Sequence, residues 1–187
     1  MEHSLNLKRL IVPGLAAGAI AVALTMPIGA DDSISVSVTP LVLSVSANVE
    51  SVNYGTLPYS PANNDRSVEE SSAITVTNNG SVPTHIELRG ANADALVNGQ
   101  DDWTLSCDPN GLGTVGNNQF VHKFGAGSSV DFNGSGIFTL CSDSSKRLAS
   151  NVALSGEAQF VLQFAMPTGT NGFGPRSSSV TVIAVAP

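Results

Sequence analysis

Apolar and polar residues alternate along much of the chain beyond residue 30, with the two-residue period of a β-strand. In residues 34–38 the apolar side chains fall on even positions, whereas in residues 41–47 they fall on odd positions. Side chains alternate strictly along a strand, so the chain must bend or bulge at Thr39-Pro40. This region therefore predicts two short strands with a break between them.

Eight further segments carry strand signals, and clusters of Gly, Asn, Ser and Pro separate them. No window of a dozen residues holds a convincing helical period. The longest alternating apolar face consists of Ala158, Phe160, Leu162, Phe164 and Met166. The segments are residues 49–54, 72–78, 84–90, 103–107, 119–124, 136–141, 157–166 and 178–186.

Nine or ten short strands joined by polar turns are typical of a sandwich of two packed sheets. The prediction is an all-β fold, an immunoglobulin-like β-sandwich of two antiparallel sheets, with a closed barrel as the alternative. Residues 31–187 form this single domain, because no internal repeat or long linker divides them.

Residues 1–30 differ in composition from the rest of the chain. Lys8 and Arg9 precede an uncharged apolar run, Leu10–Ala30, and Asp31 follows. A basic start, an apolar run and small residues before an acidic stretch indicate a secretory signal peptide cut after Ala30. A retained membrane anchor is the alternative, since the run is long enough to span a bilayer. We expect a secreted or cell-surface protein.

Cleavage would leave six Lys and Arg against fourteen Asp and Glu side chains, hence a net charge of −8. Nucleic acids and anionic membranes attract clustered basic residues, which this chain lacks. We therefore expect no nucleic-acid partner and no membrane partner after cleavage. The preferred interpretation of the negative charge is that it keeps the protein soluble.

The chain contains two cysteines, Cys107 and Cys141. An even number of cysteines in an exported chain predicts a disulfide, here closing a loop of about 35 residues and worth roughly 3.5 kcal/mol. The alternative is a pair of free buried thiols. Trp103, Leu105 and Cys107 share a parity, so we expect the tryptophan in the core beside the disulfide.

Sequence motifs for catalysis are weak. The stretch Gly111–Gly116 matches the letters of a dinucleotide-binding loop but lacks the flanking strand and helix. His85 and His122 both lie in strand patterns, with His85 expected to face solvent. A zinc site needs three or four ligands, and these two histidines could supply them only together with the two cysteines, which would then not form the disulfide. We expect a protein that is not an enzyme and has no catalytic residues or cofactor.

Calcium binding is the alternative to the prediction that the protein has no cofactor. Asp101, Asp102 and Asp108 lie close together in the sequence, and carboxylates in loops suit calcium. Their spacing is not that of an EF-hand, so solvated loop acids are the preferred interpretation. Asn79 and Asn133 begin N-x-Ser glycosylation motifs, although Asn-Gly is equally a tight-turn dipeptide.

Two stretches resemble exported bacterial proteins. One is VNYGTLPYSPANNDRSVEESSAITVTNNGSVPTHIEL, residues 52–88, and the other is DWTLSC, residues 102–107. They are similar to the TasA/camelysin biofilm proteins and to the WxL cell-wall-binding proteins. The strings WTLS and FVLQFAMPTG echo the two closing motifs of a WxL domain, but the second lacks tryptophan. The resemblance implies a surface or biofilm-matrix role and carries over no site residues.

The sequence thus predicts a structural or adhesive surface protein that self-associates as a matrix or filament subunit. Its alternating segment at residues 34–47 could add as a strand to a neighbour's sheet, or pair within its own. The alternative function is a carbohydrate or cell-wall polysaccharide binding module, with Tyr59 and Phe173 as the best exposed aromatic candidates. A hydrolase ranks last, because it needs a second carboxylate near Asp101 or Asp102.

Overall fold

The structure, a computed structural model, describes residues 37, 40–58, 68–107, 116–170, 172 and 174–187. The chain divides into two compact units, Met1–Val42 and Leu43–Pro187. The described residues of the first unit carry no strand. The predicted signal peptide lies outside the described residues, as does the predicted strand at residues 34–38 except for Ser37, which carries no strand. Within the described ranges, no helix has the length and hydrophobicity needed to cross a lipid bilayer.

The described part of the chain contains ten strands and no helix, which confirms the all-β prediction. The strands form two sheets, as expected of a sandwich-like fold. They are β1 (Val45–Ala47), β2 (Val68–Glu70), β3 (Ile74–Asn78), β4 (Thr84–Ala95), β5 (Thr104–Leu105), β6 (Gln119–Ala126), β7 (Ile137–Thr139), β8 (Lys146–Val152), β9 (Glu157–Ala165) and β10 (Arg176–Val185).

The larger sheet has seven strands built around the antiparallel pair β6 and β9. Strands β3 and β2 pair one after the other along the same edge of β9, and β1 pairs with β3 outside them. Ser71 fills the gap between β2 and β3, because its backbone N–H donates to Leu162 and its hydroxyl accepts the Leu162 N–H. Strands β5 and β7 pair with the other edge of β6.

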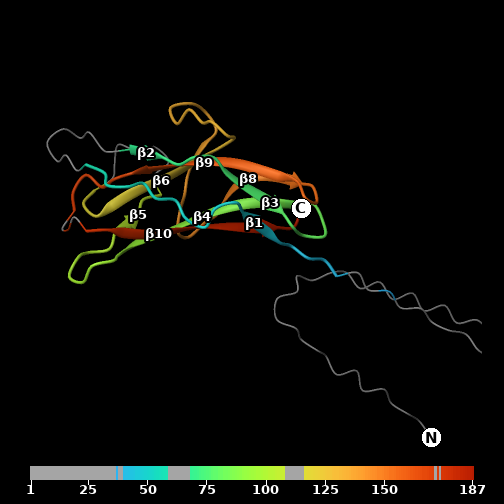
Figure 1. The fold of residues 1–187 in the computed structure, drawn as a ribbon, viewed down its shortest axis with the longest axis horizontal. Coiled ribbons are helices and arrows are strands. Elements are labelled where there is room, and N and C mark those ends of the chain that lie inside the picture. The colour runs from blue at the N-terminus through green and yellow to red at the C-terminus, as the bar shows by residue number, and fades with distance from the viewer. Residues whose placement is uncertain (1–36, 38–39, 59–67, 108–115, 171, 173) are drawn as a thin grey trace, which may run out of the picture. The chain divides into compact units, whose positions relative to one another are not determined.

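The smaller sheet has three antiparallel strands in the order β10, β4, β8. Figure 1 shows β10 and β4 side by side in one layer and β6 and β9 in the other. The register of β10 on β4 shifts between Ser178 and Val180. Strands β8 and β10 each pair with β4 alone among the described strands, so both are edge strands.

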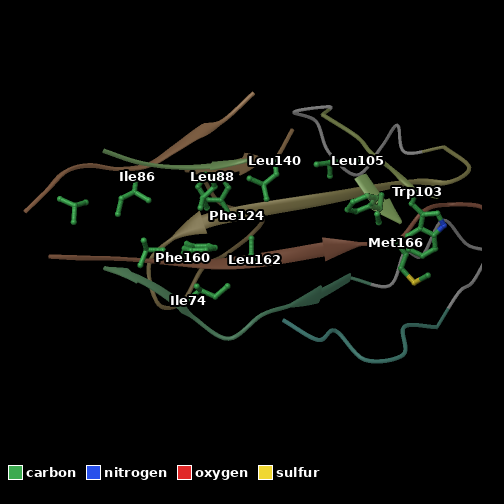
Figure 2. Close-up of a cluster of buried hydrophobic side chains, with 14 residues drawn as sticks. Ile74, Ile86, Leu88, Trp103, Leu105, Phe124, Leu140, Phe160, Leu162 and Met166 are labelled. Atoms are coloured by element: carbon green, nitrogen blue, oxygen red, sulfur yellow. The ribbon is translucent and has the colours of Figure 1, made fainter. Parts of the chain in front are cut away.

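The core lies between the inner faces of the two sheets. Ile86 and Leu88 of β4 point toward Phe160 and Leu162 of β9 in Figure 2, and all four side chains are buried. Burying apolar area at about 25 cal/mol per Å² is the main favourable contribution to folding. The alternating face predicted for residues 158–166 is therefore the inner face of β9, although the opposite face is buried too, at Val161 and Ala165.

The two sheets are joined at one side by β5, which makes a seam between them. Trp103 exchanges two backbone hydrogen bonds with Ala93 of β4, and Thr104 and Ser106 donate to the backbone oxygens of Asn118 and Phe120. Strand β4 thus pairs with β8 over its first half and with this seam over its second half. This double pairing explains why β4 extends five residues beyond its predicted end at residue 90.

The predicted strand at residues 49–54 is wrong. Pairing of β1 with β3 stops at Asn48, whose side-chain oxygen accepts the Thr75 N–H at 2.8 Å and replaces the next backbone acceptor. Residues 49–58 then continue without strand structure, with Val52 and Leu57 packed against the core. The sequence patterns also missed β2 and β8, both of which lack an alternating apolar face.

Candidate functional site

The predicted disulfide is not formed in this structure: Cys107 and Cys141 come together, but both are free thiols. The Sγ atoms of Cys107 and Cys141 and a carboxylate oxygen of Asp143 all lie within 4.8 Å of one another. The expectation that Cys107 points into the core beside Trp103 is wrong, because Cys107 is exposed while Trp103, Leu105 and Cys141 are buried. The β5 strand ends at Leu105, so the alternation that placed Cys107 inward no longer applies.

The predicted calcium candidates are engaged in hydrogen bonds within the protein. The Asp102 carboxylate accepts the Ala95 N–H at 2.8 Å, and Asp101 accepts the Asn118 amide at 3.1 Å. Neither belongs to a group of three candidate metal ligands within the described residues. Asp108, the other candidate, lies outside them. Residues 111–115 of the glycine-rich stretch, and Tyr59 and Phe173 of the predicted aromatic platform, also lie outside.

The two glycosylation motifs differ in their surroundings. The side-chain amide of Asn79 donates to the hydroxyl of Ser46 at 2.7 Å, which ties it to β1. Asn133 is exposed in the loop between β6 and β7, and its backbone N–H donates to Asp131. Both asparagines are exposed, but only the side chain of Asn79 is held against another strand.

A buried histidine was missed by the sequence reasoning. His122 of β6 is 6 % exposed and lies on the inner face, where its Nε2 is 2.8 Å from the Tyr54 hydroxyl. The ring of Tyr54 stacks on Phe164, and His122 meets Phe164 edge-on. Burial lowers the pKa of His122 to about 4 and raises that of Tyr54, so both side chains are neutral near pH 7.

Trp103, the only tryptophan, is also committed to the interior. Its indole N–H donates to the Thr170 hydroxyl at 3.0 Å, and the Arg176 guanidinium lies 5.0 Å from the centre of the ring. Arg176 also donates to the side chain of Gln100 and to the backbone oxygen of Asp101, which fixes the turn before β10 to the loop after β4. Trp103 is therefore not available as a platform for a sugar ring.

The free edge of β8 borders an open groove of about 510 Å³. The groove is lined by residues of β8, of the end of β6 and of the start of β9, with small and apolar side chains beside the polar Glu157 and Gln159. An edge strand presents unpaired backbone N–H and C=O groups to solvent. The lining residues are Ala126, Gly127, Leu148, Ala149, Glu157, Ala158 and Gln159.

The inner face of the larger sheet is incompletely covered at β7. Phe138 lies directly opposite Phe124 on β6, and the two rings stack with centroids 5.4 Å apart. Phe124 is fully buried, whereas Phe138 is 42 % exposed. The larger sheet thus presents an apolar side chain that the three strands of the smaller sheet leave open to solvent. The arrangement offers apolar surface and strand-pairing groups for recognition.

No known protein-family model matches the sequence, and no curated protein is significantly similar to it. Function is therefore inferred from the open edge of β8, the exposed Phe138 and the sequence patterns.

Proposed function

We propose that the chain is an exported, immunoglobulin-like structural subunit that self-associates by strand addition at the free edge of β8. The observation that carries the proposal is the exposure of Phe138 on a face whose neighbouring ring, Phe124, is fully buried. A strand added beside β8 would extend the smaller sheet over the inner face of the larger sheet, the face on which Phe138 lies. Covering it removes apolar area from water, and pairing satisfies the free backbone groups of β8.

The donor strand we propose is the alternating segment at residues 34–38 of a second copy. Its apolar side chains would face the groove and its serines would face solvent, as the period of a strand requires. Val45–Ala47, the end of the alternating region, pairs with β3 of its own sheet. The donor is therefore placed upstream of β1, where the described residues 40–44 carry no strand.

The setting of this assembly is the cell surface or an extracellular matrix. The signal-peptide pattern at residues 1–30 supports export, and the acidic composition supports solubility of the processed chain. The resemblance of residues 52–88 to TasA/camelysin-type proteins points the same way. Trp103 and Tyr54 make interior contacts, so a polysaccharide-binding role would rest on Tyr59 and Phe173, which lie outside the described residues.

Sedimentation velocity of the processed chain over a range of concentrations, with and without calcium, tests the proposal. We expect species larger than a monomer, and dissociation when a peptide with the sequence of residues 31–47 is added in excess. A monodisperse monomer at high concentration under both conditions would show the proposal to be wrong.

A pair of matched substitutions locates the interface. Phe138→Ser should abolish assembly, whereas Leu96→Ser should leave it intact, because Leu96 is 62 % exposed but lies in the loop after β4. Circular dichroism on both variants checks that the fold is retained. Equal assembly of the two variants would contradict the assignment of the β8 edge.

A further inference from the structure

Two chain segments cross between the sheets at the seam, and a cysteine lies at the end of each. The first, residues 103–107, is hydrogen-bonded to β4 and to β6. The second follows β7: Leu140 donates to the His122 oxygen of β6, and the Cys141 oxygen accepts the Gly90 N–H of β4 at 3.0 Å. The two segments are thus held independently by the same two strands.

The seam is packed closely enough to fix the positions of the two cysteines. A methyl group at Gly90 would overlap the Leu105 side chain and lie 3.1 Å from Cβ of Leu140, so both segments lie against the β4 backbone. Cys107 and Cys141, at the ends of these two segments, interact with each other through their thiol groups. The Ser142 N–H donates to Cys107. Their sulfur atoms lie within 4.8 Å of one another.

We infer that Cys107 and Cys141 form a disulfide that locks the seam between the two sheets, made by exchange with a small-molecule disulfide after export. This inference rests on the proposed export but not on self-association. A bond of about 2.05 Å requires the two sulfur atoms, which lie within 4.8 Å of one another, to approach further. The anchored backbone on both sides makes pairing within one chain more favourable than pairing between chains.

The exchange proceeds in two steps whose atoms balance. The Cys107 thiolate attacks one sulfur of the oxidant, releasing one thiolate and leaving a mixed disulfide on Cys107. The Cys141 thiolate then attacks the Cys107 sulfur and releases the second thiolate. Both protein thiols lose their protons to solvent, and the oxidant takes up the two electrons. Cys107 reacts first because it is exposed, while Cys141 is buried.

The acidity of Cys107 sets the pH dependence of the first step. Although Cys107 is exposed, partial desolvation of its sulfur, together with a hydrogen bond involving Cys141, raises the pKa of Cys107 to about 11. Only the thiolate is nucleophilic, and at pH 7 it makes up on the order of one part in ten thousand of this residue. The exchange should therefore be slow at neutral pH and accelerate about tenfold for each pH unit up to about 10.

A metal ion is the competing occupant of this cluster. Two thiolates and the Asp143 carboxylate could supply three ligands of a zinc site. A bound metal would require both cysteines to remain reduced, so the two possibilities exclude each other and can be separated by mass and by thiol content.

The test treats the reduced, processed chain with oxidised glutathione at several pH values and follows intact mass and free thiols. We expect both thiols to disappear with a mass loss of about 2 Da in monomeric protein, and a rate that rises about tenfold from pH 8 to pH 9. Hydrogen exchange at the Gly90 amide should slow by about tenfold or more on oxidation. A persistent glutathione adduct, disulfide-linked dimers, or retained thiols that bind cobalt(II) with thiolate charge-transfer absorption would overturn the inference.

Two comparisons keep the result independent of folding and of assembly. Cys107→Ser, at the exposed position, should show neither the mass loss nor the change in Gly90 exchange. The oxidised and reduced forms of the unaltered chain give the same information if that variant fails to fold. Repeating the measurement with Phe138→Ser separates the two proposals, because loss of assembly should leave the disulfide unchanged.

Discussion

The hydroxyl group of Tyr54 lies 2.8 Å from Nε2 of His122, although 68 residues separate them along the chain. The contact fixes the irregular segment 49–58 to the inner face of β6. Nδ1 of His122 is buried and has no hydrogen-bond partner in the described structure. We assign the neutral tautomer in which Nε2–H donates to the Tyr54 oxygen, because an orphaned acceptor is tolerated better than an orphaned N–H.

Acid should destabilise the fold through His122. Its pKa is about 4 in the folded chain and about 6.5 when exposed, so between these values the unfolded chain binds the proton more readily. The contribution of neutral His122 to the free energy of unfolding should therefore be complete above pH 6.5. It should fall as the pH is lowered toward 4, by at most about 1.4 kcal/mol per pH unit. Urea titrations between pH 5 and 7 measure this slope above the range in which carboxylates titrate.

Substitution separates His122 from the other histidine of the domain. His122→Gln should remove most of the slope, whatever its effect on stability at pH 7. His85→Gln should keep it, because His85 lies on the opposite face of β4 from the buried Ile86 and Leu88. A slope that persists in His122→Gln would assign the acid sensitivity to another group.

Removal of the Tyr54 hydroxyl should destabilise the domain without disturbing its ring stacking. Tyr54→Phe keeps the contact with Phe164, whose ring centroid is 5.4 Å away, but leaves the His122 N–H without its acceptor. An unsatisfied buried donor costs about 1–3 kcal/mol. The same change in a His122→Gln background should cost measurably less, and equal costs in the two backgrounds would show that the two side chains are not coupled.

The seam should not tolerate a side chain at Gly90. Gly90→Ala places a methyl group against Leu105 and Leu140, and overpacking of this kind costs about 1–3 kcal/mol. Gly116→Ala is the matched control, because the nearest atom, Oε1 of Gln119, would be 3.4 Å from the new methyl group. Thermal unfolding of the two variants decides the point, and equal midpoints would contradict the close packing of the seam.

Replacing Arg176 by lysine should destabilise the domain, although the positive charge is kept. Arg176→Lys loses the planar contact with Trp103 and the fork that reaches Gln100 and the Asp101 backbone. We expect a loss of about 1–2 kcal/mol and a shift in the fluorescence of the single tryptophan. Arg147, whose side chain is 42 % exposed, forms an ion pair with Glu87, and Arg147→Lys should change stability by less than about 1 kcal/mol and leave the fluorescence unchanged.

Several features of the site were accessible from sequence but were not read from it. His122 shares its parity with Phe120 and Phe124, so the alternation in residues 119–124 already placed it on the core face. The position of Phe138 opposite Phe124 could not be found this way, because register between strands depends on how distant segments pair. The exposure of Cys107 depended on where β5 ends, which its pairing with β6 decides.

The sequence by itself determined the all-β class and most strand positions, because alternation reports which side chains leave water and needs only local information. It placed the inner face of β9 and the burial of Trp103 and Leu105 correctly. Only the tertiary structure decided which edges stay open and which segments form the seam. Strand β8 has little apolar periodicity and exists because β4 offers it a hydrogen-bonding partner, and the two cysteines are neighbours because β4 and β6 hold their segments together. These are non-local relationships, which a pattern along one chain does not encode.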